Sequence, residues 1–206
     1  MQNILIFDYD GVLVDSLHIF MREFLRACRQ EGVQSITTEK DFLHLFDKNM
    51  YESMMDLGMT RETILRVVLT VKEALLKHEN KIQLFPGISE TLQHLAKTNT
   101  LLISTSNDTE VVQQFMASRH LNVFADIYGS DREPSKIKKI ETIKTAYPSN
   151  HVFYIGDTKG DILEGKQAGI KTVAVTWGWH KEHDLRTTKP DYLACEPRQL
   201  LDLFSK

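Results

Sequence analysis

Short apolar runs recur along the chain, and longer segments with a different spacing of apolar residues separate them. The runs are mostly rich in β-branched or aromatic residues and cover residues 3–7, 100–105, 125–129, 151–156 and 171–176. Runs of this length without polar alternation are typical of strands that are buried on both faces. We therefore predict a sheet with five buried strands.

The segments that link the later runs place apolar residues three and four positions apart, which is the spacing of an amphipathic helix. These segments are residues 88–97, 109–120, 135–147 and 161–169. Strands that alternate with helices predict an α/β fold with a parallel, doubly wound sheet. The final stretch, residues 191–204, is compatible with an edge strand and a closing helix.

Residues 16–85 interrupt the alternation because their pattern is helical throughout. Helical spacing is present in residues 17–32, 37–46, 49–58 and 60–78. We expect a core domain of residues 1–15 and 86–206, with a helical cap of residues 16–85 inserted after the first strand. The same pattern also fits a helical half of a single domain, and the sequence leaves both arrangements open.

Four residues mark the expected ends of the helices in this segment. Thr38 and Thr60 precede helical patterns and are typical N-cap residues. Gly32 and Gly58 follow helical patterns and are typical of helix ends.

Charge and composition narrow the range of partners. The formal net charge is -3, so the chain has no large basic field, and we expect neither nucleic acid nor an anionic membrane as its main partner. The sequence contains no apolar stretch of membrane-spanning length and does not begin with a signal-peptide pattern. Cys28 and Cys195 are far apart and suggest no disulfide framework. A cytoplasmic protein is the expectation.

Polar residues directly after the predicted strands are the candidates for chemistry, because ligands of an open parallel sheet gather at the carboxyl ends of its strands. Asp8 and Asp10 follow the first strand, with Gly11 behind them; Thr105, Ser106 and Asn107 lie at the end of the second; Asp157 and Asp161 follow the fourth. An Asp-x-Asp-Gly sequence alone is usually a turn or a cap. The two acidic pairs together carry more information than either pair alone.

Four carboxylates that converge on one site are tolerated mainly around a cation. Oxygen ligands without nearby sulfur indicate Mg²⁺. With a bound metal, Asp8 would remain ionised and could act as a nucleophile, while Asp10 could exchange a proton.

The remaining polar groups suit an anion with several oxygens, such as a phosphoryl group. Thr105 or Ser106 could donate a hydroxyl hydrogen bond, backbone N–H groups around Gly11 could hold oxygens, and Lys136 could neutralise charge. Purely structural roles are also compatible with these residues. The run Ser104–Asn107 could be a helix-capping turn, and the lysines of residues 135–144 could form a solvated helix face.

These motifs resemble those of the haloacid dehalogenase-like hydrolases, within them the capped subgroup that includes phosphoglycolate phosphatases and β-phosphoglucomutases. The resemblance covers essentially the whole chain and rests on FDYDGVLVDS, LLISTSN and GDTKGD. It implies that Asp8 forms an aspartyl-phosphate and that Asp10 is the general acid and then the base. It also implies that Asp157 and Asp161, with the backbone carbonyl of Asp10, bind Mg²⁺.

The resemblance further implies that a Thr or Ser of the second motif binds phosphate. By strand register we favour Thr105, and Ser106 is close behind. Gly11, Ser106 and Asn107 are the expected substrate-binding residues.

The chain departs from the family pattern at two places. Val12 stands where many phosphatases have Thr, and Glu133 stands before Pro134 where the third motif often has Lys. We therefore choose Lys136 as the phosphate-contacting lysine, with Lys138 or Lys139 as alternatives.

The residues and the resemblance together predict a magnesium-dependent phosphatase that hydrolyses small phosphomonoesters, similar to phosphoglycolate phosphatase, with a small phosphorylated metabolite as its partner. A phosphomutase of the β-phosphoglucomutase type would use the same residues. A non-enzymatic receiver-like domain also places acidic residues at strand ends, but its pattern does not require a helical insertion. The sequence predicts no oligomeric state.

Overall fold

The computed structural model describes residues 2–149 and 151–205, and its centre is a parallel six-stranded sheet with the strand order β5-β4-β1-β6-β7-β8. The strands are β1 (Ile4–Phe7), β4 (Thr100–Ser104), β5 (Phe124–Tyr128), β6 (Val152–Gly156), β7 (Lys171–Val175) and β8 (Tyr192–Ala194). The first strand lies in the middle, and the chain adds strands on both sides of it. The predicted doubly wound α/β fold is confirmed.

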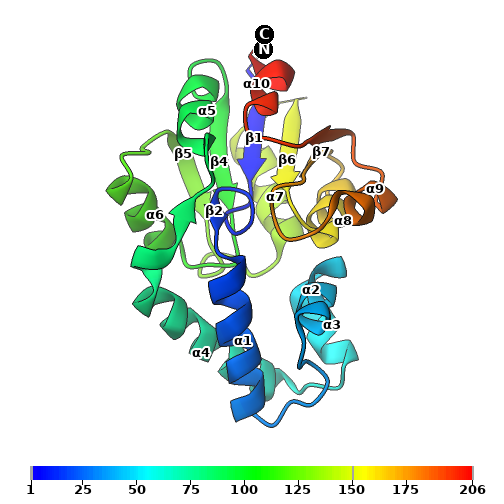
Figure 1. The fold of residues 1–206 in the computed structure, drawn as a ribbon. Coiled ribbons are helices and arrows are strands. Elements are labelled where there is room, and N and C mark those ends of the chain that lie inside the picture. Colours follow the sequence, from blue (N-terminus) through cyan, green and yellow to red (C-terminus); the bar gives the residue numbers. More distant parts are fainter. Residues whose placement is uncertain (1, 150, 206) are drawn as a thin grey trace.

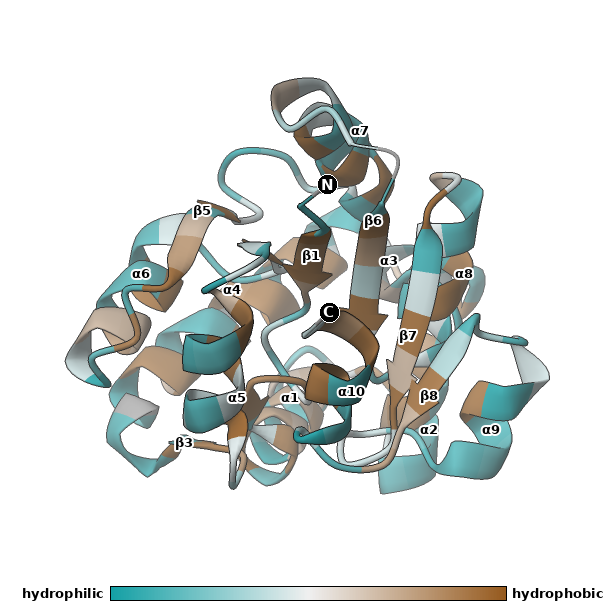
Figure 2. Ribbon diagram, turned by 90° about the horizontal axis from the view of Figure 1, so that it is seen from above, coloured by the Kyte–Doolittle hydropathy of each residue, from teal (hydrophilic) through white to brown (hydrophobic). Residues whose placement is uncertain are grey.

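Helices cover both faces of this sheet. One face packs against α5 (Ile88–Leu95), α6 (Thr109–Ser118) and α10 (Gln199–Phe204), and the other against α7 (Lys136–Ala146), α8 (Lys159–Gln167) and α9 (Glu182–Thr187). Figure 2 shows the apolar strands between α7 on one side and α5 and α10 on the other. Strand β1 illustrates why: Leu5 and Phe7 are buried on the first face, and Ile4 and Ile6 on the second. The run has no polar alternation because both faces are covered.

Four further helices lie beyond the carboxyl ends of the strands, as Figure 1 shows. They are α1 (Leu17–Gln30), α2 (Glu39–His44), α3 (Met50–Asp56) and α4 (Arg61–Lys77), and we call them the lid helices. The four expected helix signals are confirmed. The hydroxyls of Thr38 and Thr60 each accept a backbone N–H three residues on, and Gly32 and Gly58 follow helix ends with φ of 71° and 83°.

A small ribbon connects the lid helices to the rest of the chain. Its strands, β2 (Val14–Asp15) and β3 (Gln83–Leu84), are antiparallel and two residues long. Strands this short have no periodicity, so the sequence did not predict them. The sequence also did not predict α9.

Apolar side chains from α1, α2 and the short 3-10 helix η1 (Leu45–Asp47) that follows α2 pack against the loop after β7. Phe20, Phe42 and Phe46 surround Trp179, and the ring centroids of Phe46 and Trp179 are 4.8 Å apart. The division into a core of residues 1–15 and 86–206 and a cap of residues 16–85 stays a proposal, because one apolar cluster runs through both. Among the described residues, no helix is both long and apolar enough to cross a membrane.

Candidate active site

Three carboxylates meet at the carboxyl end of the sheet. Asp8 follows β1, Asp157 follows β6, and Asp161 lies in the first turn of α8. Because β1 and β6 are hydrogen-bonded neighbours, the residues that follow them are close in space. One oxygen atom from each of the three carboxylates lies within 4.8 Å of the other two, so the group could hold a metal ion.

The start of α8 fixes the orientation of Asp161. Thr158 is the N-cap residue, and its hydroxyl accepts the backbone N–H of Asp161. In return Asp161 Oδ2 accepts the Thr158 N–H at 3.0 Å and the Thr158 hydroxyl at 2.8 Å. This reciprocal capping box occupies one carboxylate oxygen. The other oxygen, Oδ1, is left for Lys136.

Asp157 has one satisfied and one unsatisfied oxygen. Its Oδ2 accepts the backbone N–H of Trp179 at 2.7 Å, whereas its buried Oδ1 has no hydrogen-bond donor within the described ranges. Burial, followed by the nearby carboxylates of Asp161 and Asp8, raises the pKa of Asp157 well above its usual range. A buried carboxylate oxygen without a donor is costly unless a cation sits beside it. The donor set consists of hard oxygens and therefore fits a cation such as Mg²⁺.

A lysine neutralises part of this negative charge. Lys136 is the first residue of α7, and its Nζ lies 3.3 Å from Asp8 Oδ2 and pairs with Asp161. Burial acts to lower the pKa of Lys136, but the carboxylates of Asp161 and Asp8 outweigh burial and raise it. The lysine therefore stays charged.

The two alternative lysines lie elsewhere. Lys138 is exposed. Lys139 is buried and donates to the backbone carbonyl of Thr105, and burial lowers its pKa to about 8. Of the three, the structure brings Lys136 to the carboxylates.

The first two aspartates differ in their surroundings. Burial raises the pKa of Asp8 to about 7, although Lys136 acts to lower it. Burial also raises the pKa of Asp10, whose Oδ2 accepts a hydrogen bond of 2.5 Å from the Asn107 amide. Asn107 was expected to bind substrate. The structure shows its amide donating to the Asp10 carboxylate, and a contact between Asn107 and a substrate stays a prediction.

Gly11 was expected to bind substrate, with backbone N–H groups around it holding phosphoryl oxygens, and this stays a prediction. Its backbone N–H donates to the Val14 carbonyl at 2.9 Å and closes the turn after Asp10. The glycine is required for a steric reason. Its φ is +77°, and a Cβ atom there would lie 2.0 Å from Asp157 Oδ2. Gly178 packs against Asp157 in the same way, with a Cβ clash at 2.4 Å that the sequence did not reveal.

The two hydroxyl candidates after β4 are separated by burial. Thr105 is fully buried, and its Oγ1 accepts the backbone N–H of Asn107 at 3.0 Å. Ser106 is exposed and lines the same cavity as Asp8 and Asp10. The geometry favours Ser106 over Thr105, the reverse of the order expected from strand register.

The cavity over Asp8 lies between the sheet end and the lid helices. Its sheet side includes Lys136 and Asp161, and its lid side includes Phe20, Phe46 and the run 48–51. Sequence reasoning missed Glu164, which also lines the cavity and accepts a hydrogen bond from Asn49 of the lid at 3.1 Å. Glu164 follows Asp161 in α8, but its spacing resembles an ordinary polar helix position.

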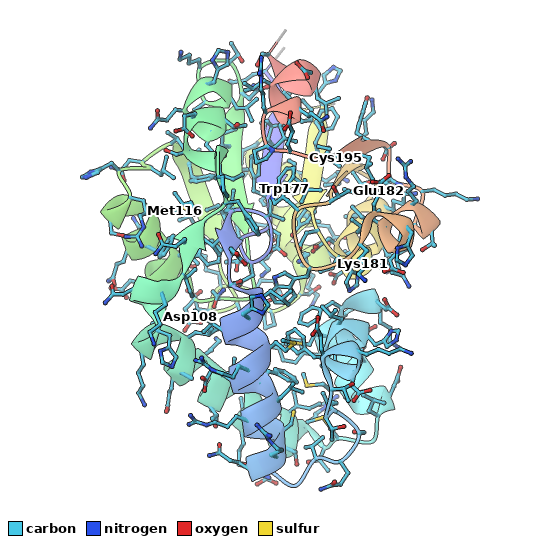
Figure 3. All side chains as sticks on the ribbon, in the orientation of Figure 1. Asp108, Met116, Trp177, Lys181, Glu182 and Cys195 are labelled. Atoms are coloured by element: carbon cyan, nitrogen blue, oxygen red, sulfur yellow. The ribbon has the colours of Figure 1, made fainter. Side chains whose placement is uncertain are left out.

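Two side chains from the loop after β7, the Trp179 indole and the His180 imidazole, contact the lid as well. Trp179 lines the cavity below the lid phenylalanines. The His180 Nδ1 accepts the Lys159 N–H at 3.0 Å, and its Nε2 is 3.1 Å from the Leu43 carbonyl oxygen. These partners fix the neutral tautomer with the proton on Nε2. His180 therefore bridges the sheet and the lid. Trp177, labelled in Figure 3, donates from its indole to the Val12 carbonyl at 3.0 Å.

Acidic residues at strand ends, beneath helices and on a doubly wound sheet, form the candidate active site. The chain belongs to the haloacid dehalogenase-like hydrolase family, whose model matches residues 5–175. The family, the fold and the hydrolase class predicted from the sequence are thereby confirmed.

Individual relatives extend over nearly the whole chain. A phosphoglycolate phosphatase from Synechococcus elongatus is 27% identical over 206 residues, which cover 98% of this chain and 97% of the relative. A pyrophosphatase PpaX from Bacillus mycoides is 26% identical over 214 residues, which cover 99% of this chain and 97% of the relative. A haloacid dehalogenase-like hydrolase from Streptococcus pneumoniae, of known structure, is 29% identical with a TM-score of 0.81 and covers 98% of each chain.

Proposed function

We propose that this protein is a magnesium-dependent phosphatase that hydrolyses small phosphomonoesters through an aspartyl-phosphate on Asp8. One observation carries the proposal: carboxylates from two separate strand ends meet Lys136 in a cavity, and the buried Oδ1 of Asp157 lacks a donor in the described part of the chain. The relatives that are named as phosphatases support it.

The carboxylates of Asp8, Asp157 and Asp161, together with the backbone carbonyl of Asp10, would hold the Mg²⁺ ion. The ion supplies positive charge that stabilises the transferring phosphoryl group. It also favours the ionised form of Asp8, which burial otherwise disfavours. Lys136 and Ser106, which both line the cavity, would bind the phosphoryl oxygens.

The reaction takes two displacement steps on this chain. The ionised carboxylate of Asp8 attacks phosphorus while protonated Asp10 donates its proton to the leaving alkoxide. Asp10, now a carboxylate, then takes a proton from the water that hydrolyses the acyl-phosphate. Burial favours the protonated form of Asp10 in the first step, and the Asn107 amide stabilises the carboxylate needed in the second. The lid helices would keep bulk water from the intermediate.

Small phosphorylated metabolites are the proposed substrates, and neither nucleic acid nor membrane is proposed as a partner. Phosphoglycolate and pyrophosphate should be tested as substrates as well, because the relatives are named for them. A phosphomutase would use the same site residues, and Val12, where this chain departs from many phosphatases, is fully buried and does not line the cavity. It therefore supports no second function. The receiver-like alternative does not account for the lid helices over the site.

The test is phosphate release from a panel of phosphomonoesters with Mg²⁺ and after chelation. We expect activity with Mg²⁺, loss under chelation, and a decrease of at least about 10³-fold in Asp8→Asn. Asp202→Asn, the same substitution at an exposed position of α10, is the matched control and should keep wild-type activity. Full activity of Asp8→Asn would exclude Asp8 as the nucleophile.

A further inference from the structure

The cavity over Asp8 adjoins a second, apolar cavity inside the lid. The two cavities share Phe20, Met50, Tyr51 and Ser106 in their walls. The second cavity, which we call the lid chamber, is lined mainly by Phe20, Phe24, Met50, Tyr51, Val68 and Val71. These residues come from α1, the start of α3, and α4.

The chamber adjoins the residue that holds the Asp10 carboxylate in place. Ser106 and Asn107 line the chamber, and the Asn107 amide donates to Asp10, the proposed proton donor to the leaving oxygen. A leaving group bonded to the oxygen next to Asp10 therefore has the chamber wall beside it. Apolar walls with few polar groups are typical of sites for small organic ligands.

The lysines near this path are already paired with carboxylates. Lys136 contacts Asp8 and Asp161. Lys48, in the wall of the main cavity, pairs with Asp56.

Lys72 of the chamber pairs with Asp108 at 2.7 Å and donates to the Ser130 hydroxyl at 3.1 Å. Asp108, labelled in Figure 3, lies where the sheet end meets the lid helices. Within residues 2–149 and 151–205, every lysine that lines either cavity thus has an acidic partner.

The half-buried Glu164 also lines the main cavity, and no lysine pairs with its carboxyl group at ion-pair distance in the described structure. Asp8, Asp10 and Asp161 add three more carboxyl groups to the same wall. A bound Mg²⁺ and a phosphoryl dianion would offset each other. A second anionic group on the substrate would then meet carboxylates and apolar side chains, which makes its desolvation costly.

We propose that the preferred substrates are phosphate monoesters of a neutral, largely apolar alcohol whose organic group occupies the lid chamber. This inference rests on the proposed phosphatase function and narrows its substrate class. It distinguishes this chain from relatives whose names specify a leaving group with its own negative charge.

The test compares kcat/KM for methyl, propyl and butyl phosphate with kcat/KM for phosphoglycolate and pyrophosphate, all with Mg²⁺. Burial of each additional methylene should raise kcat/KM by about threefold to fourfold until the chamber is full. We expect butyl phosphate to exceed phosphoglycolate by at least about tenfold.

A variant of α4 tests the location. Val68→Phe places a larger side chain into the chamber and should flatten the increase from methyl to butyl phosphate to less than about twofold in total. Leu65→Phe, on the exposed side of the same helix, is the matched control and should keep the wild-type increase. Should Val68→Phe fail to fold, two measurements still test the substrate class. The wild-type ester series tests the dependence on chain length, and Lys48→Met tests whether this lysine promotes hydrolysis of phosphoglycolate.

The outcomes separate the two proposals. Ester hydrolysis without dependence on chain length, or faster hydrolysis of phosphoglycolate that Lys48→Met selectively abolishes, overturns the apolar substrate class and leaves the phosphatase function intact. Release of phosphate from no ester or anhydride overturns the phosphatase function and this inference with it.

Discussion

Single oxygen atoms determine where a cation could bind in the site. Asp161 and Asp157 both use one carboxylate oxygen to accept backbone N–H groups, so the remaining oxygen of each is directed by the fold. Lys136 pairs with the remaining oxygen of Asp161, while that of Asp157 has no donor among the residues described. The local hydrogen bonds, rather than the acidic composition alone, create a place for a cation.

The choice between the two hydroxyls is also decided by single residues. We expect Ser106→Ala to lower kcat/KM by about tenfold or more, because it removes a donor from the cavity wall. We expect Thr105→Ala chiefly to lower the free energy of unfolding, by about 1 kcal/mol, because its buried hydroxyl accepts the Asn107 N–H. Steady-state kinetics and urea unfolding of both variants check this. A larger kinetic loss in Thr105→Ala than in Ser106→Ala, at equal stability, would restore the order expected from strand register.

The loop after β1 shows how an element end constrains the site. Gly11→Ala should lower the free energy of unfolding by more than about 2 kcal/mol, because a left-handed φ is unfavourable for Ala and the new Cβ overlaps Asp157. Gly32→Ala is the matched control at the end of α1. It has a similar φ of +71° but no atom within 4 Å of the added Cβ, so it should cost only about 1 kcal/mol. Equal losses for the two variants in urea unfolding would show that the overlap with Asp157 has no effect.

The start of α2 gives a pH-dependent contribution to stability. Asp41 accepts the backbone N–H groups of Thr37 and Thr38, and these bonds lower its pKa to about 2 from an ordinary value of 3.8. Because the pKa of Asp41 is lower in the folded chain than in the unfolded chain, the ionised carboxylate stabilises the fold at pH values above the pKa of the unfolded chain. This stabilisation is lost as the pH falls through the pKa of the folded chain. Asp41→Asn should therefore be less stable than wild type at pH 6, and the difference should shrink from about pH 4 downward. A difference between the two urea midpoints that stays constant from pH 6 to pH 3 would contradict this.

Helices and strands with strong periodicity were predicted from the sequence, whereas features set by tertiary contacts were not. The strand Ile4–Phe7, expected at residues 3–7, and the caps at Thr38 and Thr60 follow from local patterns. The β2–β3 ribbon is too short to show a pattern, and its pairing joins residues 14–15 with 83–84. Long-range pairing of this kind depends on where the chain comes back to the sheet after the last lid helix.

At the scale of the whole molecule, only those site residues could be predicted whose type and position are typical of catalysis or metal binding. Asp8 and Asp157 follow neighbouring strands and Asp161 begins α8, and the parallel fold brings these three carboxylates together, whereas Asp10 lines the same cavity outside that group. Glu164 lines the cavity but was not predicted from the sequence, because its place in the cavity wall depends on how the lid covers α8.

The lid is held on both sides of the cavity. Asn49 bonds Glu164 and the His180 imidazole lies against the Leu43 carbonyl on the α8 side, while Lys72 pairs with Asp108 on the opposite side. Polar contacts from both sides leave the apolar chamber between them. The same sequence segment that lacks strand patterns thus supplies the wall against which a substrate would pack.

A bound metal ion would link the site to the stability of the whole fold. A ligand that binds the folded chain alone stabilises it by about 2.7 kcal/mol when its concentration is about 100 times its Kd. Mg²⁺ should therefore raise the urea midpoint of the wild-type protein in a concentration-dependent manner, with tetramethylammonium chloride of equal ionic strength as the control. Asp157→Asn should abolish this dependence, because it replaces a carboxylate whose buried Oδ1 is free of donors within the described residues. If Mg²⁺ stabilised Asp157→Asn as strongly as wild type, the ion would have to bind elsewhere, and the convergence of the β1 and β6 ends would not serve a metal.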